Sequence, residues 1–487
     1  MASDTAHSKA SPRLKMSTKL FYGLGSVAFG VKDNGYSYLL LIFYNQVVGL
    51  PATWVGVALL GALAFDAIID PLIGAASDRL HSPLGRRHPF MYAAAVPVTV
   101  AYFALWSPPH IGQVGQFAYL VVLTLIVRTF ISVYEVPSSA LAAELSQDYD
   151  ERSTLLSYRF FFGWVGGLTV QALAFAVFLA SDVRHPVGQL NPEGYARYGA
   201  FAAGVIFVAI VVSALGTHNL IPSLAKPPKR AAGGWKRAFA EAQQTLSNRS
   251  FLFVMASNVA IALGLGLTAS LNTYFNTYFW GFSSRDLAIL TLSVFAAAFA
   301  ALGLGPRASR RFGKRATFIG ATVLATALGL APILLRLAGL FPPNHSPQVL
   351  AILIGTSISG VTCAIIGMTM TNSMIADVVE ASELETGRRD EGLFFAAAAF
   401  GQKAVSGLGL LGGAAVIEFV KLKPGMAPSQ VAPETLARLG EVYCPVLAVV
   451  FGIGVLLALG YKITRAGHAE TLTRLAAATE QVREPLL

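Results

Sequence analysis

The chain has 487 residues, of which 54% are hydrophobic and only 13% are charged. Ordinary soluble proteins have about 25% charged residues, so this composition excludes a soluble multidomain enzyme and a disordered chain. The net charge of +10 fits the basic loops of a membrane protein rather than a nucleic-acid binder, and only two cysteines, Cys363 and Cys444, exclude a disulfide scaffold and a zinc finger.

Twelve apolar stretches are long enough to cross a membrane, since a spanning helix needs about 20 mostly apolar residues. In chain order they are 20–48, 53–76, 90–107, 116–144, 155–181, 198–219, 250–279, 286–304, 316–339, 348–371, 393–418 and 440–463. A backbone in lipid must form its hydrogen bonds within the segment, so each stretch is predicted to be an α-helix. The predicted fold class is an all-α membrane protein with twelve transmembrane helices.

Basic residues gather in the loops on one side of these stretches. Loops 49–52 and 108–115 contain no Lys or Arg, whereas the N-terminal tail and the loops after the second, sixth and eighth stretches are rich in them. Because basic loops stay in the cytoplasm, both termini are predicted to be cytoplasmic.

The longest basic loop divides the chain into two halves. We predict a cytoplasmic tail (1–19), an N-terminal six-helix bundle (20–219), a cytoplasmic central loop (220–249), a C-terminal six-helix bundle (250–463) and a second cytoplasmic tail (464–487). The halves share a loop pattern, because SDRLHSPLGRRHP follows the second stretch and SRRFGKR follows the eighth. Two similar six-helix halves predict the major facilitator fold. No G-x-x-x-x-G-K-[ST] loop occurs, so transport is expected to use a gradient rather than ATP.

The second stretch carries two carboxylates inside the membrane, where ionisable side chains are costly and therefore indicate function. Asp66 and Asp70 are four residues apart and project from one face of a helix. Two carboxylates at this spacing share a proton, share a cation such as sodium, or pair with buried basic groups in a structural role. We interpret the pair as a candidate proton or sodium site.

Charged residues in three later stretches extend this set. Arg128 and Glu135 lie seven residues apart on one face of the fourth stretch, with Ser132 between them. Arg159 in the fifth stretch either enters the interior or extends its head group to the membrane surface. Lys403 lies ten residues into the eleventh stretch, near the bilayer centre, where a carboxylate partner is expected.

The first and seventh stretches contain polar and aromatic residues. Asp33 and Tyr36 lie in GVKDNGYSY, and Asn272 lies in NTYFNTYFW together with Tyr278 and Trp280. Aromatic rings and amides can stack on a sugar and bind its hydroxyls, but they are equally typical of an aromatic belt at the membrane surface. We favour the belt for Tyr278 and Trp280, and Asp33, Tyr36 and Asn272 are candidate substrate contacts.

Three segments are similar to a known transporter family. They are DAIIDPLIGAASDRLHSPLGRRHP, EVPSSALAAELSQDYDERSTLLSYRFF and SMIADVVEASELETGRRDEGLFFAAAAFGQKAVSGLG. They resemble the glycoside–pentoside–hexuronide:cation symporters of the major facilitator superfamily, to which melibiose permease belongs. The resemblance covers nearly the whole chain. It implies a cation-coupled secondary transporter.

The resemblance also implies roles for individual residues. Asp66 and Asp70 match the cation-site carboxylates of the family, Ser132 matches a threonine hydroxyl in that site, and Lys403 matches a lysine near it. Glu135 stands in the place of a sugar-binding aspartate. Arg159 matches the arginine that partners this aspartate.

Three departures from the family pattern bear on substrate and ion. Gly30 aligns with the sugar-binding aspartate of the first helix, and Asp33 lies one turn later. Ser139 replaces a sugar-stacking tryptophan. Arg128 stands where the family has a glycine near the cation site, so it could pair with Asp66 or Asp70 and exclude sodium. This third departure favours a proton over sodium as the coupling ion.

These observations together predict a cation-coupled symporter that moves a sugar or glycoside by alternating access. A symporter of a lysophospholipid or another amphiphile is the alternative, and a membrane receptor without transport is a remote one. An enzyme is not expected, because no H-E-x-x-H or G-x-S-x-G motif occurs in the helices.

The expected partners follow from that function. We expect a small-molecule substrate, contact with membrane lipids, no nucleic acid, and no cofactor beyond the coupling ion, H⁺ or Na⁺. The protein is expected to be a monomer that crosses the plasma (inner) membrane several times.

Overall fold

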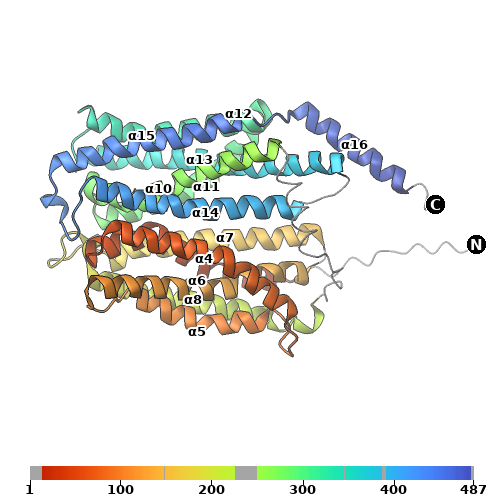
Figure 1. Cartoon of the computed structure of the whole chain (residues 1–487), viewed down its shortest axis with the longest axis horizontal. Helices are drawn as coiled ribbons and strands as arrows, with labels where there is room; N and C mark the ends of the chain where they lie inside the picture. Colours follow the sequence, from red (N-terminus) through yellow and green to blue (C-terminus); the bar gives the residue numbers. More distant parts are fainter. Residues whose placement is uncertain (1–13, 147, 225–248, 345, 387–390, 484–487) are drawn as a thin grey trace, which may run out of the picture. The chain divides into compact units, whose positions relative to one another are not determined.

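The structure is a computed structural model that describes residues 14–146, 148–224, 249–344, 346–386 and 391–483. Every regular element in these ranges is a helix (Figure 1). Residues 225–248 of the predicted central loop, 1–13 of the first tail and 484–487 of the second lie outside the described residues.

The helices follow the predicted stretches in chain order. The first stretch contains α1 (Met16–Leu24), α2 (Val27–Asn34) and α3 (Leu40–Ile42), with π-helical turns at Gly35–Leu39 and Phe43–Val47. The next five are α4 (Ala52–Arg79), α5 (His88–Leu105), α6 (Gly112–Leu145), α7 (Tyr149–Leu173) with a π-helical turn at Ala174–Phe178, and α8 (Pro192–His218). The last six are α10 (Arg249–Tyr274) with a π-helical turn at Phe275–Phe279, α11 (Ser284–Phe312), α12 (Lys314–Leu337), α13 (Pro347–Thr386), α14 (Glu391–Phe419) and α15 (Pro433–Ala458). A further helix, α16 (Arg465–Arg483), follows them, and 3₁₀ turns occupy Gly188–Leu190, Ile221–Ser223 and Pro428–Gln430.

Ten helical segments of the described chain are long and apolar enough to cross a membrane. The other two predicted stretches are the interrupted first one and α14. The largest boundary difference is in α13, which was expected to end at residue 371 and continues to Thr386. Its last part, SMIADVVEASELET, is too polar to count as a membrane stretch. It contains no Gly or Pro to stop a helix, so the helix continues past the apolar run.

Glycines with positive φ recur at matching places in the two halves of the chain. The pairs are Gly49 and Gly281, Gly85 and Gly313, and Gly112 and Gly339, each about 230 residues apart. The backbone hydrogen bonds that enclose the two glycines of the first pair also match. Leu50 N donates to Tyr44 O and Phe282 N donates to Asn276 O, both at 2.9 Å. This supports the internal repeat that the loop pattern indicates.

The described residues form two compact units. Unit 1 comprises Met1–Tyr36, Ala64–Leu179 and Asn191–Lys229, and unit 2 comprises Ser37–Leu63, Ala180–Leu190 and Arg230–Leu487. Unit 2 thus includes residues 37–63 and 180–190, which the prediction places in the N-terminal bundle.

Hydrogen bonds within unit 2 explain why residues 37–63 belong to it. Thr273 Oγ1 donates to Tyr38 O at 2.5 Å, and Tyr274 OH donates to Asn45 Oδ1 at 2.8 Å. Tyr278 OH donates to the side-chain oxygen of Gln46 at 3.0 Å. The end of the first membrane stretch is therefore held by α10 and its π-helical turn.

The predicted aromatic belt at Tyr278 and Trp280 is wrong. Their exposed fractions are 2% and 4%, and the hydroxyl of Tyr278 binds Gln46 and the carbonyl oxygen of Met426. The aromatic rings of this segment pack inside the protein, and the segment from Phe275 to Phe279 forms a π-helical turn.

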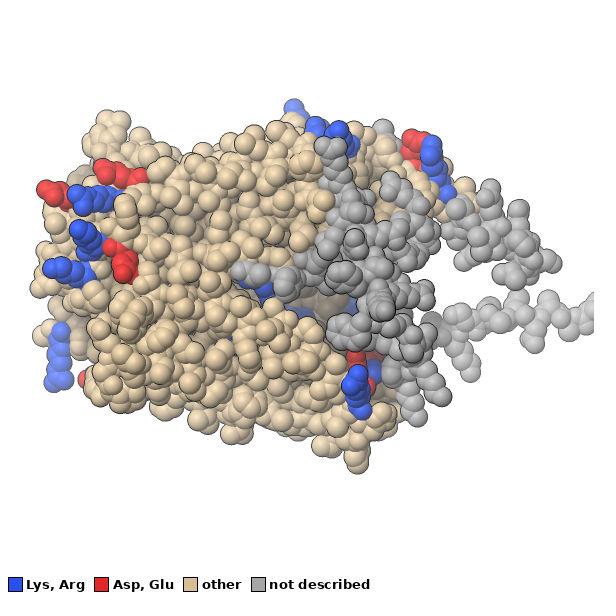
Figure 2. All heavy atoms as spheres, viewed as in Figure 1, with Lys and Arg blue, Asp and Glu red and all other residues tan. Residues whose placement is uncertain are grey.

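Side chains on the surface agree with a membrane location. On the face drawn in Figure 2, most visible charged side chains lie at the ends of the helices, and the outer surface along the helices consists of other residues. Large apolar side chains are also exposed in the described chain, such as Phe160 at 72% and Phe299 at 73%. Exposed aromatic surface of this kind is compatible with lipid rather than water.

The arrangement of basic loops generates a testable topology. Reporter fusions after residue 230 and at residue 487 are expected to read cytoplasmic, because the flanking loops hold the excess of Lys and Arg. A fusion at 344–346 is expected to read external, and one in the uncharged loop 108–111 serves as its control. A cytoplasmic signal at 344–346 would contradict the twelve-helix assignment.

Candidate functional site

Unit 1 contains a buried ion pair between α6 and α4. The guanidinium of Arg128 donates to the carboxylate of Asp66, and the exposed fractions of the two residues are 5% and 4%. The guanidinium carbon also lies 5.3 Å from the centre of the Tyr36 ring. Of the two partners that the sequence left open for Arg128, the structure pairs it with Asp66.

The pair leaves polar atoms unused. Among the described residues, Oδ1 of Asp66 and Nε of Arg128 are buried without a hydrogen-bond partner. A buried polar group without a partner needs a physical explanation, such as a catalytic role or a bound water or ion. We call Asp66, Arg128 and Tyr36 the upper charge centre.

The other candidate cation residues lie beside this centre along the same helices. Asp70 is one turn after Asp66 on α4 and is half-buried, and Ser132 is one turn after Arg128 on α6 and is buried. A 3.6-residue repeat places each of them on the face of its neighbour. Their roles in holding a proton or sodium remain predictions.

A second charged group joins α6 to α7. Arg159 Nη1 donates to Ser138 Oγ at 2.8 Å, and Nη2 donates to the carbonyl oxygen of Glu135 at 3.3 Å. The Glu135 carboxylate is 3.9 Å from Nη2, and the guanidinium lies 4.9 Å from the centre of the Phe29 ring. Arg159 is 7% exposed, so it does not extend to the membrane surface. We call Glu135, Arg159 and Phe29 the lower charge centre.

The two centres are separated along the helices in a regular way. Phe29 and Tyr36 are seven residues apart on the first stretch, and Arg128 and Glu135 are seven apart on α6. Seven residues of α-helix span about 10 Å. The first stretch and α6 run in opposite directions, so each contributes one residue to each centre.

Asp33 lies between these two levels. It follows Phe29 by four residues, and its carboxylate oxygen Oδ1 is 2.5 Å from Nζ of Lys32. The Asp33 side chain is 57% exposed and that of Glu135 is 33% exposed, whereas Lys32 is buried. Two accessible carboxylates on apolar helices can therefore accept hydrogen bonds from a bound molecule.

Two predicted site residues belong to unit 2. Asn272 is exposed on α10 and accepts a hydrogen bond from Nδ2 of Asn276 at 3.0 Å. Lys403 is exposed on α14. Their predicted roles in substrate binding and coupling remain predictions.

The sequence missed the partners of the basic loops. Arg87 Nε donates to Glu144 Oε1 at 2.8 Å, and Arg87 Nη2 to Asp78 Oδ1 at 2.5 Å. In unit 2, Lys314 Nζ lies 2.5 Å from Asp377 Oδ1. In both halves the basic residue starts a helix and the acidic partner lies near the end of the next one, a repeated placement that could have identified Glu144 and Asp377.

The chain matches a known protein family over most of its length. Residues 21–465 match the family described as MFS/sugar transport protein. The chain belongs to this family. It is therefore a membrane transporter and not an enzyme.

Similar proteins extend over almost the whole chain. An uncharacterized symporter of Synechocystis is 27% identical over 97% of this chain and 98% of its own length. The putative glycoside/cation symporter YagG of Escherichia coli is 25% identical, covering 95% of both chains. The sphingosine-1-phosphate transporter of Mus musculus is also 25% identical, over 92% of this chain and 90% of its own.

A solved structure confirms the fold. The inward-open xylose transporter XylE of Escherichia coli superposes with a TM-score of 0.60 and 16% identity, covering 94% of this chain and 99% of that one. The predicted all-α major facilitator fold is thus confirmed. A likeness at this identity concerns the fold alone.

The upper charge centre generates a stability prediction. Asp66→Asn leaves the buried Arg128 without an anion, and breaking a buried pair from one side costs about 3–5 kcal/mol. A lower apparent melting temperature of the purified protein is expected. Asp66→Asn with Arg128→Met removes both charges and should recover much of the loss.

Glu470→Gln is the matched control for that measurement. It removes a carboxylate from an exposed pair with Arg474, so a loss of at most about 1 kcal/mol is expected. Equal melting temperatures for Asp66→Asn and Glu470→Gln would show that Asp66 and Arg128 do not form a buried pair.

Proposed function

We propose that the protein is a proton-coupled symporter that moves a sugar or glycoside across the plasma (inner) membrane by alternating access. The contact between Arg128 and Asp66 is the observation that carries the choice of ion. The accessible carboxylates of Asp33 and Glu135, beside the buried Arg159, support the choice of substrate.

A proton suits the upper charge centre better than sodium. Asp66 and Asp70 bring two negative charges and Arg128 one positive charge, so one proton makes the group neutral. Sodium needs several oxygen ligands around it, and a guanidinium in contact with Asp66 takes one of those oxygens and repels the cation. Proton transfer to a carboxylate needs neither that space nor a ligand shell.

Hydroxyl-rich ligands suit the lower charge centre. Ionised carboxylates accept hydrogen bonds only, and hydroxyl groups donate them. Glu135 is oriented by Arg159, whose own position is fixed by Ser138 and Phe29. The name of the relative YagG, a putative glycoside/cation symporter, supports the same substrate class.

An amphiphile is the second candidate substrate. Ser139, which replaces a sugar-stacking tryptophan of the family, is exposed on α6 and offers no ring for a sugar to stack on. The mouse relative is named for sphingosine-1-phosphate. Uptake assays that compare glycosides with lysolipids distinguish the two.

Glu135→Gln tests the substrate site. It keeps the shape and one acceptor but removes the charge, and a hydrogen bond to a charged group contributes about 1.5–3 kcal/mol. A loss of affinity of roughly 10- to 150-fold for the transported glycoside is expected. Folding of the variant is checked by size-exclusion chromatography, because the change also removes the carboxylate nearest the buried Arg159. Unchanged affinity in the folded variant would remove Glu135 from the site.

Arg128→Gly tests the coupling ion. Uptake by the wild-type protein is expected to follow a proton gradient and to be insensitive to replacing sodium with choline. The variant loses the competing charge, so it should gain sodium-dependent thermal stabilisation, because a ligand that binds the folded state raises its stability.

Two measurements make this test decisive. Asp66→Asn with Arg128→Gly, which lacks one carboxylate, is the control and should not respond to sodium. Folding is checked by size-exclusion chromatography first, since the single variant breaks a buried pair. Sodium-stimulated uptake by the wild-type protein would refute proton coupling.

A further inference from the structure

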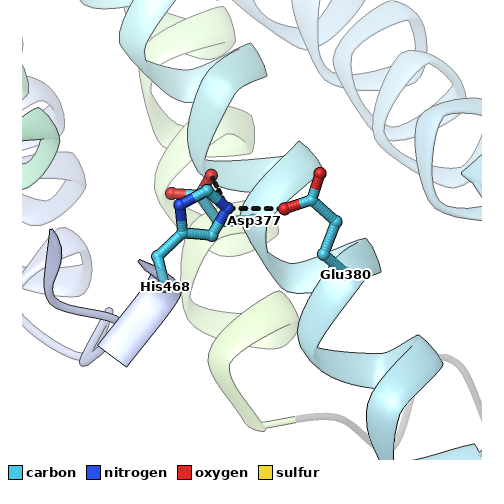
Figure 3. Close-up of side chains that lie close together, drawn as sticks. All are labelled: Asp377, Glu380 and His468. Carbon is cyan, nitrogen blue, oxygen red and sulfur yellow. Dashed lines mark hydrogen bonds and ion pairs between the residues drawn. The ribbon is translucent and has the colours of Figure 1, made fainter. Parts of the chain in front are cut away.

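A cluster of ionisable side chains joins α16 to the end of α13 (Figure 3). The imidazole Nε2 of His468, on the first turn of α16, lies 2.5 Å from Glu380 Oε2 and 3.4 Å from Asp377 Oδ1. The transport function proposed above uses none of these three residues.

Asp377 is the fixed part of this cluster. Its side chain is 6% exposed, Lys314 Nζ lies 2.5 Å from Oδ1, and Tyr461 OH donates to Oδ2 at 2.7 Å. Burial, together with Asp377, raises the pKa of Tyr461 above its ordinary value, so the phenol remains a hydrogen-bond donor at neutral pH. Both oxygens of Asp377 therefore have partners before His468 approaches.

The charge of His468 decides how well this arrangement is compensated. Asp377 and Glu380 carry two negative charges against one positive charge on Lys314, so one negative charge remains, and an imidazolium cancels it. A neutral imidazole either donates from Nε2 without a charge or directs the Nε2 lone pair at two carboxylates. The protonated form thus gains a charge-assisted hydrogen bond to Glu380 and a second attraction to Asp377.

We propose that His468 is a proton-binding site that attaches α16 to α13, and that loss of its proton releases the helix. Imidazole is the side-chain group whose charge changes between about pH 5 and 8 when its surroundings do not perturb it. The attachment is complete at low pH, where the imidazolium is present, and weakens as the pH rises.

A metal ion fits the same three side chains less well. Their nearest nitrogen and oxygen atoms all lie within 4.8 Å of one another. Nitrogen and oxygen ligands lie about 2.0–2.2 Å from a zinc ion, which in a tetrahedral site places them more than 3 Å apart, whereas the contact of His468 with Glu380 has hydrogen-bond length. The ammonium of Lys314 also faces the oxygen of Asp377 that a metal would need.

Neighbouring elements bring further charges to this end of unit 2. Arg315 on α12 donates to the carbonyl oxygen of Tyr461 at 3.1 Å, and Arg465 on α16 donates to the carbonyl oxygen of Arg310 on α11 at 3.3 Å. Lys314, Arg315 and Arg465 repel a positive charge on His468, and the two carboxylates that contact the imidazole attract that charge.

Hydrogen exchange of the full-length purified protein tests the proposal. Exchange in residues 465–483 is measured at pH 5.5, 6.5, 7.5 and 8.5 and corrected for the intrinsic effect of pH. In the wild type, protection of α16 is expected to fall by roughly tenfold between pH 5.5 and 8.5, the scale of one charge-assisted hydrogen bond. His468→Gln should exchange rapidly at every pH, and His468→Arg should stay protected at every pH.

His185→Gln is the matched control, because His185 lies in a different part of unit 2, where it pairs with Asp182. It should keep the wild-type pH response of α16, and Glu380→Gln should reduce that response. A pH-independent wild type, or a His468→Gln variant with the wild-type response, would overturn the proposal. Protection of α16 by zinc at pH 8.5 that a chelator reverses would overturn it in favour of a metal site.

Discussion

Charge that is buried among apolar helices has to be compensated by the protein itself, and this constraint organises unit 1. Two arginines, Arg128 and Arg159, are almost fully buried. Each draws a carboxylate and an aromatic ring toward it, and the two groups together involve the first membrane stretch, α4, α6 and α7. Replacing such a pair by apolar residues is often neutral for stability, so stability alone does not explain their presence.

The local structure of the first stretch makes these contacts feasible. Gly30 packs so closely on α7 that a Cβ atom there would clash with the carbonyl oxygen of Gly163, and one at Gly35 would clash with the hydroxyl of Tyr102. The π-helical turn that begins at Gly35 adds a residue to the helical repeat, which turns the following side chains relative to a regular α-helix. Close approach of the first stretch to α7 places Phe29 near Arg159, and the π-helical turn contains Tyr36, whose ring faces Arg128.

Much of this could be predicted from the sequence, because lipid imposes simple rules. Apolar length located the membrane helices, and the cost of intramembrane charge singled out Asp66, Arg128, Glu135 and Arg159 before their contacts were known. Whether an aromatic side chain faces the interior or the surface was harder to predict. Tyr278 is of a residue type that is common in a surface belt, but it is buried. Its burial could not be predicted, because the π-helical turn and the position of Gln46 depend on tertiary contacts. The partners Glu144 and Asp377 were missed for a related reason, since polar residues at helix ends look like ordinary solvated surface.

The two halves pair an acidic helix end with a basic helix start, but they use different basic side chains. In unit 1, Arg87 binds Glu144 and Asp78 through a guanidinium that stays charged at any physiological pH. At the corresponding place in unit 2, an ammonium and an imidazole share Asp377. The fold requires only that the acidic end of one helix be held by the basic start of another, and either arrangement satisfies that. The imidazole adds α16 to the pair that Lys314 and Asp377 already form, so under the proposal above only the attachment of α16, and not the pairing of α12 with α13, depends on protonation.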